Sequence, residues 1–192
     1  MENIYCDNWE RELDCQFLIP DRCREKAYIC SPLSADQDGQ MLENMRTARA
    51  YMFYAMKKMN LAARAPHAYL PMLLCDRIPA ERVLGLQFGL RLLESCDRML
   101  VCGNRISRGM RGEIEKAAGF GVPITVFDEA LLYKVQKIVT QSDGEKNSVR
   151  LDRENPAMAS GNPISFLERQ NHGGKINDWG KEPEHCYAHL NG

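Results

Sequence analysis

The chain has 192 residues, of which 44% are hydrophobic, and its formal net charge is −1. This length and composition suit one domain with a single buried core, and the near-neutral charge gives no field that would attract nucleic acid or a membrane surface. No apolar run reaches the about 18 residues of a membrane-spanning helix, and the first residues lack the features of a signal peptide, so we expect a cytoplasmic protein.

The eight cysteines are interpreted as reduced structural thiols. No two of them form a C-x-x-C pair, which is a usual spacing of zinc ligands. Cys30 and Cys102 lie within apolar segments, where a free cysteine behaves as a small hydrophobic side chain. Thiols in the cytoplasm stay reduced. We therefore expect neither a metal ion nor another cofactor.

The first part of the chain predicts an arm, a strand, a helix and a second strand. Residues 1–24 are polar with scattered apolar side chains, and we expect an arm that packs on the body or on a neighbouring chain. Residues 26–31 are an apolar run closed by proline, which is typical of a buried strand and a turn. Methionines and alanines recur at helical spacing between Met41 and Met59. Residues 65–75 are interpreted as a second strand or extended segment.

A second helix is expected to begin at Pro79, because proline suits the first turn of a helix. Its apolar side chains predict a stripe that faces the core. The stripe comprises Val83, Leu86, Leu90 and Leu93, and is widened by Leu84 and Phe88.

The alternation of strands and helices continues to about residue 140. Strands are expected at 99–102 and 123–127, a helix with Met110 and Ile114 facing inward lies between them, and another helix follows at 129–138. This pattern predicts an α/β domain over residues 25–140, with a parallel sheet covered by helices on both faces. Residues 141–192 are polar and without a clear period, so we interpret them as a loosely ordered tail.

Residues 103–114 are the segment most informative about function. They lead from the end of a strand into a helix, where free backbone N–H groups suit an anion or a sugar. Glu113 is expected in the first turn of that helix. A carboxylate there can act as nucleophile or acid/base, or it can only complement the helix dipole. Ligands of parallel sheets bind at the carboxyl ends of the strands, so we expect the site at 31–39 and 103–111.

Several motifs resemble those of the nucleoside 2-deoxyribosyltransferase-like superfamily. They are Tyr-Ile-Cys-Ser-Pro at 28–32 and Gly-Met-x-x-Glu-Ile-x-x-Ala at 109–117. The chain is most similar to an uncharacterised bacterial and phage branch of this superfamily. That branch shares Ala-Pro-His-x-Tyr-x-Pro at 65–71, Cys-Asp at 96–97 and Ser-x-Gly-Met-x-x-Glu at 107–113.

The resemblance covers roughly residues 26–128. It implies a Rossmann-like (flavodoxin-like) three-layer sandwich with a parallel sheet of four to five strands. It also implies a homo-oligomer, because the family commonly completes its pocket with a neighbouring subunit.

Carried over residue by residue, the resemblance makes Glu113 the nucleophile and Tyr28 the hydroxyl that positions its carboxylate. His67 is interpreted either as a structural histidine or as a contact of the base or a phosphate. Arg105, Arg108 and Arg111 either hold phosphate or are solvated loop charges. The residues expected around the substrate are Ser31, Pro32, His67, Ser107, Arg108, Gly109 and Met110.

The chain also departs from the family pattern. Ser107 stands where the deoxyribosyltransferases have an Asp six residues before the nucleophile, and Glu115 replaces a later glycine. The upstream Asp that protonates the base has no clear equivalent. The candidates for that proton are Asp76, His67 and Asp97.

Two functions follow from these residues. The first is an enzyme that cleaves the N-glycosidic bond of a nucleoside or nucleotide, or transfers its deoxyribosyl group, with Glu113 as the nucleophile. The arginines favour a phosphorylated substrate. The alternative is a non-catalytic module that binds a nucleotide or a nucleotide-derived signal. In both cases the ligand is a small molecule, and we expect neither nucleic acid nor a membrane as partner.

Overall fold

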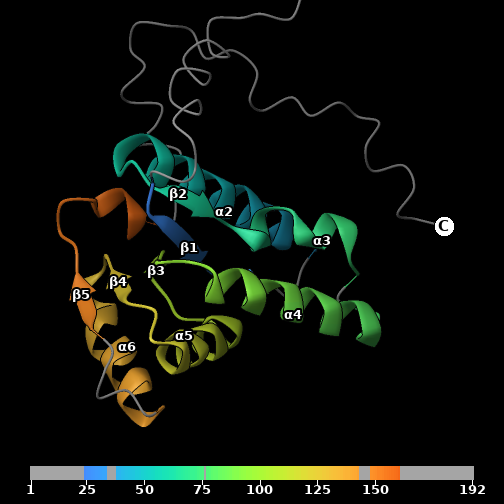
Figure 1. The fold of residues 1–192 in the computed structure, drawn as a ribbon. Coiled ribbons are helices and arrows are strands. Elements are labelled where there is room, and N and C mark those ends of the chain that lie inside the picture. The colour runs from blue at the N-terminus through green and yellow to red at the C-terminus, as the bar shows by residue number, and fades with distance from the viewer. Residues whose placement is uncertain (1–23, 34–37, 76, 143–147, 161–192) are drawn as a thin grey trace, which may run out of the picture.

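A computed structural model describes residues 24–33, 38–75, 77–142 and 148–160 (Figure 1). Within this part of the chain, five parallel strands form one sheet in the order β2-β1-β3-β4-β5. The strands are β1 (Lys26–Cys30), β2 (Ala62–Arg64), β3 (Arg98–Val101), β4 (Ile124–Val126) and β5 (Val149–Leu151). This is the strand order of flavodoxin-like folds, so the predicted Rossmann-like sandwich is confirmed.

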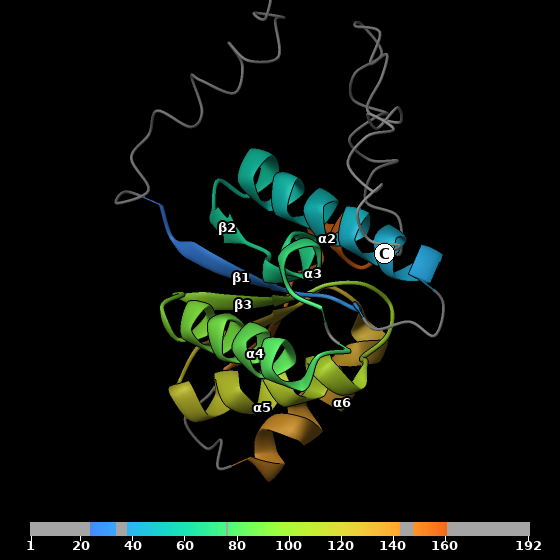
Figure 2. The same ribbon diagram turned by 90° about the vertical axis from the view of Figure 1, so that its right-hand side faces the viewer.

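Helices cover both faces of the sheet (Figures 1 and 2). One face carries α2 (Asp38–Lys58), and the other carries α4 (Pro79–Glu94), α5 (Arg108–Phe120) and α6 (Glu129–Gln141). Short helical segments complete the described fold: η2 (Pro66–Ala68), α3 (Leu70–Leu73) and η3 (Pro156–Met158). None of the helices in the described part combines the length and the apolar character needed to cross a bilayer.

Each central strand supplies both halves of the core, because successive side chains point to opposite faces. In β1, Ala27 and Ile29 pack on the α2 side, whereas Tyr28 and Cys30 pack under α4 and α5. All four are completely buried. Tyr28 therefore places a hydroxyl group inside an otherwise apolar layer, on the side of the sheet where α5 begins.

The predicted inward face of α4 is confirmed at Leu93 and wrong for most of its other members. Val83, Leu84, Leu86 and Phe88 are all exposed, and the buried residues of α4 are Gly89 and Leu93. Gly89 faces the sheet, and a Cβ atom there would lie 3.5 Å from the hydroxyl oxygen of Tyr28, in ordinary van der Waals contact. The helix contacts the sheet through this glycine, and its larger apolar side chains turn away from the core.

The segment 65–75 contains no strand, contrary to the prediction. The strand β2 ends at Arg64, and Pro66 and Pro71 stand in the first turns of η2 and α3. Proline lacks an N–H and has a fixed φ, which suits the beginning of a helix. The two prolines therefore start short helices.

Part of the expected tail belongs to the sheet. The strand β5 pairs with β4, and Ala157 and Met158 of η3 are buried in the core on the α2 side. The backbone of Met158 also accepts a hydrogen bond from the N–H of Gly103, at 2.8 Å. Neighbouring segments create this burial, which a short polar sequence does not reveal. The rest of the tail and residues 1–23 of the arm lie outside the described residues.

We expect Tyr54→Phe to lower the free energy of unfolding by about 1 kcal/mol, the typical net contribution of one hydrogen bond. The Tyr54 hydroxyl of α2 donates to Oδ1 of Asn155, at 3.3 Å, and so ties the segment after β5 to the body. Urea unfolding of the full chain measures the change. Tyr133→Phe, at a side chain that is 73% exposed, is the matched control. Equal stability of both variants would show that this tie contributes nothing.

Candidate active site

The site lies where β1 and β3 end side by side. The chain connections diverge here, because β1 leads to β2 on one side and β3 leads to β4 on the other. Such a switch point leaves a crevice at the carboxyl edge of a parallel sheet. Ser31 follows β1, and the loop after β3 leads into α5. The two segments that the sequence indicated are thus brought together.

The N-cap residue of α5 determines where this helix begins. The hydroxyl oxygen of Ser107 accepts a hydrogen bond from the N–H of Met110, at 3.3 Å, and Ser107 is the N-cap. The N–H groups of Arg108 and Gly109 precede the first intrahelical bonds and remain directed out of the helix end. Gly121 ends the helix in the left-handed conformation, with φ of 73°.

The position of Glu113 in α5 differs from the prediction. The helix begins at Arg108, so Glu113 is its sixth residue and lies in the second turn. The interaction of a charge with the helix dipole falls off beyond the first turn. A role limited to complementing the dipole therefore fits Glu113 poorly.

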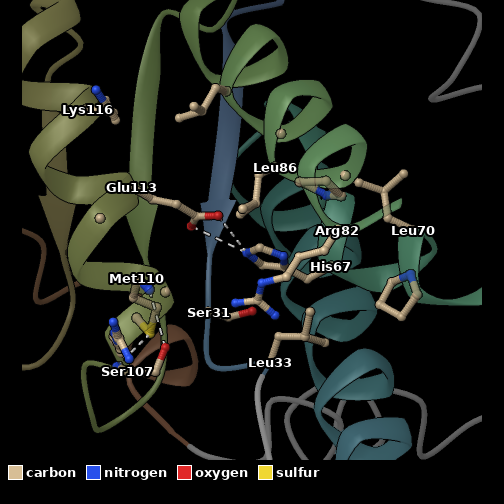
Figure 3. A pocket seen from close by; sticks show the side chains of 18 of the residues that line it. Ser31, Leu33, His67, Leu70, Arg82, Leu86, Ser107, Met110, Glu113 and Lys116 are labelled. Carbon is tan, nitrogen blue, oxygen red and sulfur yellow. Dashed lines mark hydrogen bonds and ion pairs between the residues drawn. The ribbon is translucent and has the colours of Figure 1, made fainter. Parts of the chain in front are cut away.

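Glu113 is held by two side chains from other elements. The Tyr28 hydroxyl of β1 donates to Oε1 of Glu113 at 2.9 Å, which confirms the predicted contact. Nε2 of His67 in η2 lies 3.1 Å from Oε1 and 3.3 Å from Oε2 (Figure 3). The rings of Tyr28 and His67 meet edge to face, with centroids 6.4 Å apart. Tyr28 and His67 hold the carboxylate on one side. The side chains of Glu113 and His67 are each 17% exposed, so the other side of the carboxylate is accessible.

Burial and the charge of Glu113 determine the protonation state of the Tyr28 hydroxyl group. Burial raises the pKa of the Tyr28 hydroxyl well above its usual value, and the negative charge of Glu113 raises it further. The same two causes, in the same order, raise the pKa of the Cys30 thiol. Both groups are therefore protonated at neutral pH. Tyr28 acts as a hydrogen-bond donor to the carboxylate, not as a base.

A cleft of about 510 Å³ opens in front of Glu113 (Figure 3). This volume falls in the usual range for small-molecule sites. One wall is formed by η2, α3 and α4, with apolar side chains such as Leu70, Leu74 and Leu86. The opposite wall is α5, from Ser107 to Lys116. The cleft therefore combines a carboxylate with apolar walls and backbone N–H groups.

The cleft gathers most of the predicted substrate-contacting residues. Its lining includes Ser31, His67, Ser107, Arg108, Gly109, Met110 and Glu113. Tyr28 lies beneath the cleft floor, fully buried. Pro32 is half-buried and lies beside Gly103 instead of in the lining.

The hydroxyl of Ser31 is one of the few buried polar groups of the described fold. Its residue is 1% exposed, and the oxygen has no hydrogen-bond partner among the described residues. A buried polar group without a partner costs about 1–3 kcal/mol. Since Ser31 also lines the cleft, a ligand with a donor or acceptor group would remove this cost.

Other candidate residues do not reach the cleft. Arg111 bonds Glu115 and Gln141 on the side of α6, and Arg105 is exposed outside the lining. The carboxylate of Asp97 accepts the N–H of Lys26 at the beginning of β1, at the opposite edge of the sheet. Asp76 lies outside the described residues. Of the three proton-donor candidates, His67 is thus the one placed at Glu113.

Sequence reasoning missed the contribution of α4. Arg82, Gly85, Leu86 and Gly89 recur at spacings of three, one and three residues and line the cleft. The two glycines were the available signal, because they remove side chains from the part of the helix that faces Leu74 and Tyr28. In the described part of the chain, no group of three or more His, Cys, Asp or Glu side chains is arranged to hold a metal ion.

A family model described as a domain of unknown function (DUF7768) matches residues 25–127, and the chain belongs to this family. The matched span contains every residue that lines the cleft, from Ser31 to Lys116. No curated protein and no solved structure matches the chain.

Proposed function

We propose that this DUF7768 protein cleaves the N-glycosidic bond of a nucleoside or nucleotide, or transfers its deoxyribosyl group, with Glu113 as the nucleophile. One observation carries the proposal: a carboxylate held by Tyr28 and His67 faces a cleft large enough for a nucleotide. The resemblance to the nucleoside 2-deoxyribosyltransferase-like superfamily supports the same assignment.

The chemistry requires a carboxylate beside the anomeric carbon. As the bond to the base breaks, its electron pair leaves with the base and positive charge builds up on that carbon. Oε2 of Glu113 then forms a bond to the carbon, and the departing base takes up a proton from solvent water. Water or a second base displaces Glu113 and loses a proton. Tyr28 bonds only Oε1, so Oε2 is the less engaged oxygen and the better attacking atom.

His67 is placed to orient the nucleophile. In retaining glycosidases the nucleophile and the acid stand about 5–5.5 Å apart, because the leaving group lies between them. Nε2 of His67 is only 3.1–3.3 Å from the oxygens of Glu113. This distance suits a direct bond to the carboxylate and leaves no room for a departing base. We therefore assign His67 as a positioning residue.

The charges of the cleft favour a phosphorylated substrate. Arg82, Arg108 and Lys116 line it, and the free N–H groups at the beginning of α5 lie at the same end as Arg108 and Ser31. A phosphate would accept hydrogen bonds from such groups. The apolar wall suits a sugar and a base. A nucleoside 5′-monophosphate combines these parts.

We expect Arg108→Ala to lower the affinity for a nucleoside 5′-monophosphate by up to about fivefold, since an exposed guanidinium contributes at most about 1 kcal/mol. The affinity for the unphosphorylated nucleoside stays unchanged. Calorimetry with both ligands measures the difference. Arg111→Ala is the matched control, because that guanidinium is bonded on the α6 side. Equal losses for both ligands would contradict a phosphate contact.

A binding module is the second candidate function. Glu113 is the only acidic side chain in the cleft lining among the described residues, so no second carboxylate is seen there to protonate a leaving base. Such a module would recognise a nucleotide or a nucleotide-derived signal without changing it.

We also propose a cytoplasmic protein that forms a homo-oligomer and whose partner is a small molecule, neither nucleic acid nor a membrane. The formal net charge of −1 and the apolar side chains of the N-terminal arm support these assignments. The resemblance implies the oligomer independently.

One experiment separates the two functions. Release of free base is followed by chromatography for deoxy- and ribonucleosides and their 5′-monophosphates, and calorimetry is performed on the same compounds. The enzyme releases base from at least one of them. A protein that binds a nucleotide tightly and leaves it intact for hours is the binding module. Mass spectrometry of co-purified small molecules identifies which compounds to add.

A further inference from the structure

Glycine is concentrated in the helices that form the walls of the cleft. The helices α4 and α5 contain five glycines, and four of them line the cleft. These four are Gly85 and Gly89 of α4, and Gly109 and Gly112 of α5. Glycine destabilises a helix relative to alanine, because it has more backbone freedom to lose on folding. Its concentration at one cavity therefore needs an explanation.

The fold itself does not require glycine at the two positions in α4. Neither Gly85 nor Gly89 is among the described residues with a positive φ, so other residues can adopt the same backbone conformation. A Cβ atom would lie 3.4 Å from Cδ1 of Leu74 at Gly85, and 3.5 Å from the hydroxyl oxygen of Tyr28 at Gly89. Both distances are ordinary van der Waals contacts. Alanine therefore fits the folded chain at either position.

The remaining neighbour of the two glycines is the cleft. Residues 85 and 89 are four apart, so they lie on the same side of α4, about 6 Å apart along the helix axis. Without side chains they leave a flat strip of helix backbone, which we call the glycine strip. Leu74 and Leu86 line the cleft next to it. A flat strip with apolar neighbours is complementary to the face of a planar heterocyclic ring.

A second observation indicates that the cleft holds a ligand. The Ser31 side chain is buried, and its hydroxyl oxygen has no hydrogen-bond partner among the described residues. Ser31 lines the cleft, and in Figure 3 its side chain points into it, toward the side where His67 and Arg82 lie. Buried polar groups are almost always hydrogen-bonded. A polar part of a bound molecule would supply the partner of this hydroxyl group.

The chemistry at Glu113 directs the base toward the glycine strip. A nucleophile displaces a leaving group from the opposite side of the reacting carbon. Glu113 projects from α5, so the base departs toward the opposite wall, to which the strip belongs (Figure 3). The Tyr28 hydroxyl, which is bonded to Glu113, is also the atom nearest to a Cβ at Gly89. The strip therefore begins beside the carboxylate and across the cleft from α5.

We propose that the planar base of the nucleotide packs on the glycine strip, and that Gly85 and Gly89 are specificity-determining residues of the cleft. A side chain at either position would occupy the space of the ring. The assignment rests on the proposed function, and it holds for the enzyme and for the binding module, because both must hold the base.

The first test combines affinity with stability. Calorimetry with the four 2′-deoxynucleoside 5′-monophosphates identifies the nucleotide that the wild type binds. We expect Gly85→Ala and Gly89→Ala each to weaken its binding by about tenfold or more, because a methyl group intrudes on a packed ring. Both variants should melt about 2–4 °C above the wild type, because alanine favours the helix.

The matched control is Gly119→Ala. Gly119 also lies in α5, but it is outside the cleft lining, and a Cβ there would meet nothing within 4 Å. This variant should gain a similar thermal stability and bind the nucleotide as the wild type does.

The second test uses 2-deoxyribose 5-phosphate, which lacks a base. Its binding, followed by ligand-observed NMR at millimolar concentration, should be the same in the wild type and in both α4 variants. In the isotope-labelled full chain, the Hα resonances of Gly85 and Gly89 should shift when the nucleotide is added, because an aromatic ring changes the local field. The sugar phosphate should leave these resonances in place.

Three results would overturn the assignment. The first is nucleotide affinity that is unchanged in both α4 variants. The second is a loss of thermal stability, which would show that packing requires the glycines. The third is an equal loss of 2-deoxyribose 5-phosphate binding, which would indicate damage to the whole cleft. A wild type that binds none of the four nucleotides contradicts the proposed function itself, so the two failures are distinguishable.

Discussion

We expect Glu113→Gln to lower the release of free base by about 100-fold or more and to leave nucleotide binding nearly unchanged. The carboxamide has the shape of the carboxylate and can still accept the hydrogen bond from Tyr28. It lacks the negative charge that meets the developing positive charge of the sugar, and it is a poor nucleophile. A 100-fold loss corresponds to about 2.7 kcal/mol of transition-state stabilisation.

The matched control for this variant is Glu115→Gln. Glu115 lies on the same helix and pairs with Arg111 on the α6 side, so its loss should leave base release unchanged. Chromatography gives the rates, and calorimetry gives the affinities of the same proteins. Base release that persists in Glu113→Gln would place the chemistry at another residue. Binding that disappears together with turnover would mean that the substitution damages the cleft.

We expect His67→Ala to lower the rate of base release by about 30-fold, and His67→Gln to restore part of it. A hydrogen bond to a charged group contributes about 1.5–3 kcal/mol, and His67 is bonded to both oxygens of Glu113. Alanine leaves the carboxylate held by Tyr28 alone. Glutamine supplies a neutral N–H donor that can orient the carboxylate again but cannot transfer a proton.

Leaving groups of different acidity distinguish positioning from proton donation. A 4-nitrophenyl 2-deoxyriboside needs no proton on its leaving group, whereas a natural nucleoside does. A positioning residue acts through Glu113, so His67→Ala should slow both substrates by a similar factor. A loss confined to the natural nucleoside would identify His67 as the acid and contradict our assignment. Tyr69→Phe, in the same segment, controls for local damage.

Much of the fold could be predicted because its signals are local. The apolar run at 26–31 and the helical period after Met41 each depend on neighbouring residues, and both elements are present in the structure. The three-residue strands β2 and β5 were misplaced or missed. The equally short β4 lies in an apolar run that predicts it, whereas β2 and β5 at the sheet edges carry little pattern of their own and are defined by pairing with a neighbour.

The face of α4 shows a different kind of failure. Its apolar residues occur on several sides of the helix, so periodicity alone does not say which side packs on the sheet. In the structure the buried residues of α4 are Gly89 and Leu93, and Gly89 faces the hydroxyl group of Tyr28. A contact between residues 28 and 89 depends on the tertiary fold and is invisible to any local pattern.

Only part of the candidate site could be predicted, because the rest also depends on the tertiary fold. Glu113 and Tyr28 came from motifs that resemble a known superfamily, and their hydrogen bond is present. The turn that Glu113 occupies depends on where α5 begins. Ser107 caps the helix, which therefore begins at Arg108, earlier than a first-turn position of Glu113 requires. Arg82 belongs to α4, whose orientation the sequence did not reveal, so its place in the cleft was missed as well.

The two outermost strands of the sheet have a consequence for self-association. An exposed strand edge offers unpaired N–H and C=O groups, which is the usual route to fibrils and precipitation. Here β2 and β5 have only three residues each, so within the described part of the chain either margin of the sheet presents about 10 Å of strand backbone. A template that short gives an incoming strand too few hydrogen bonds for lasting attachment. Uncontrolled growth by strand addition is thereby disfavoured.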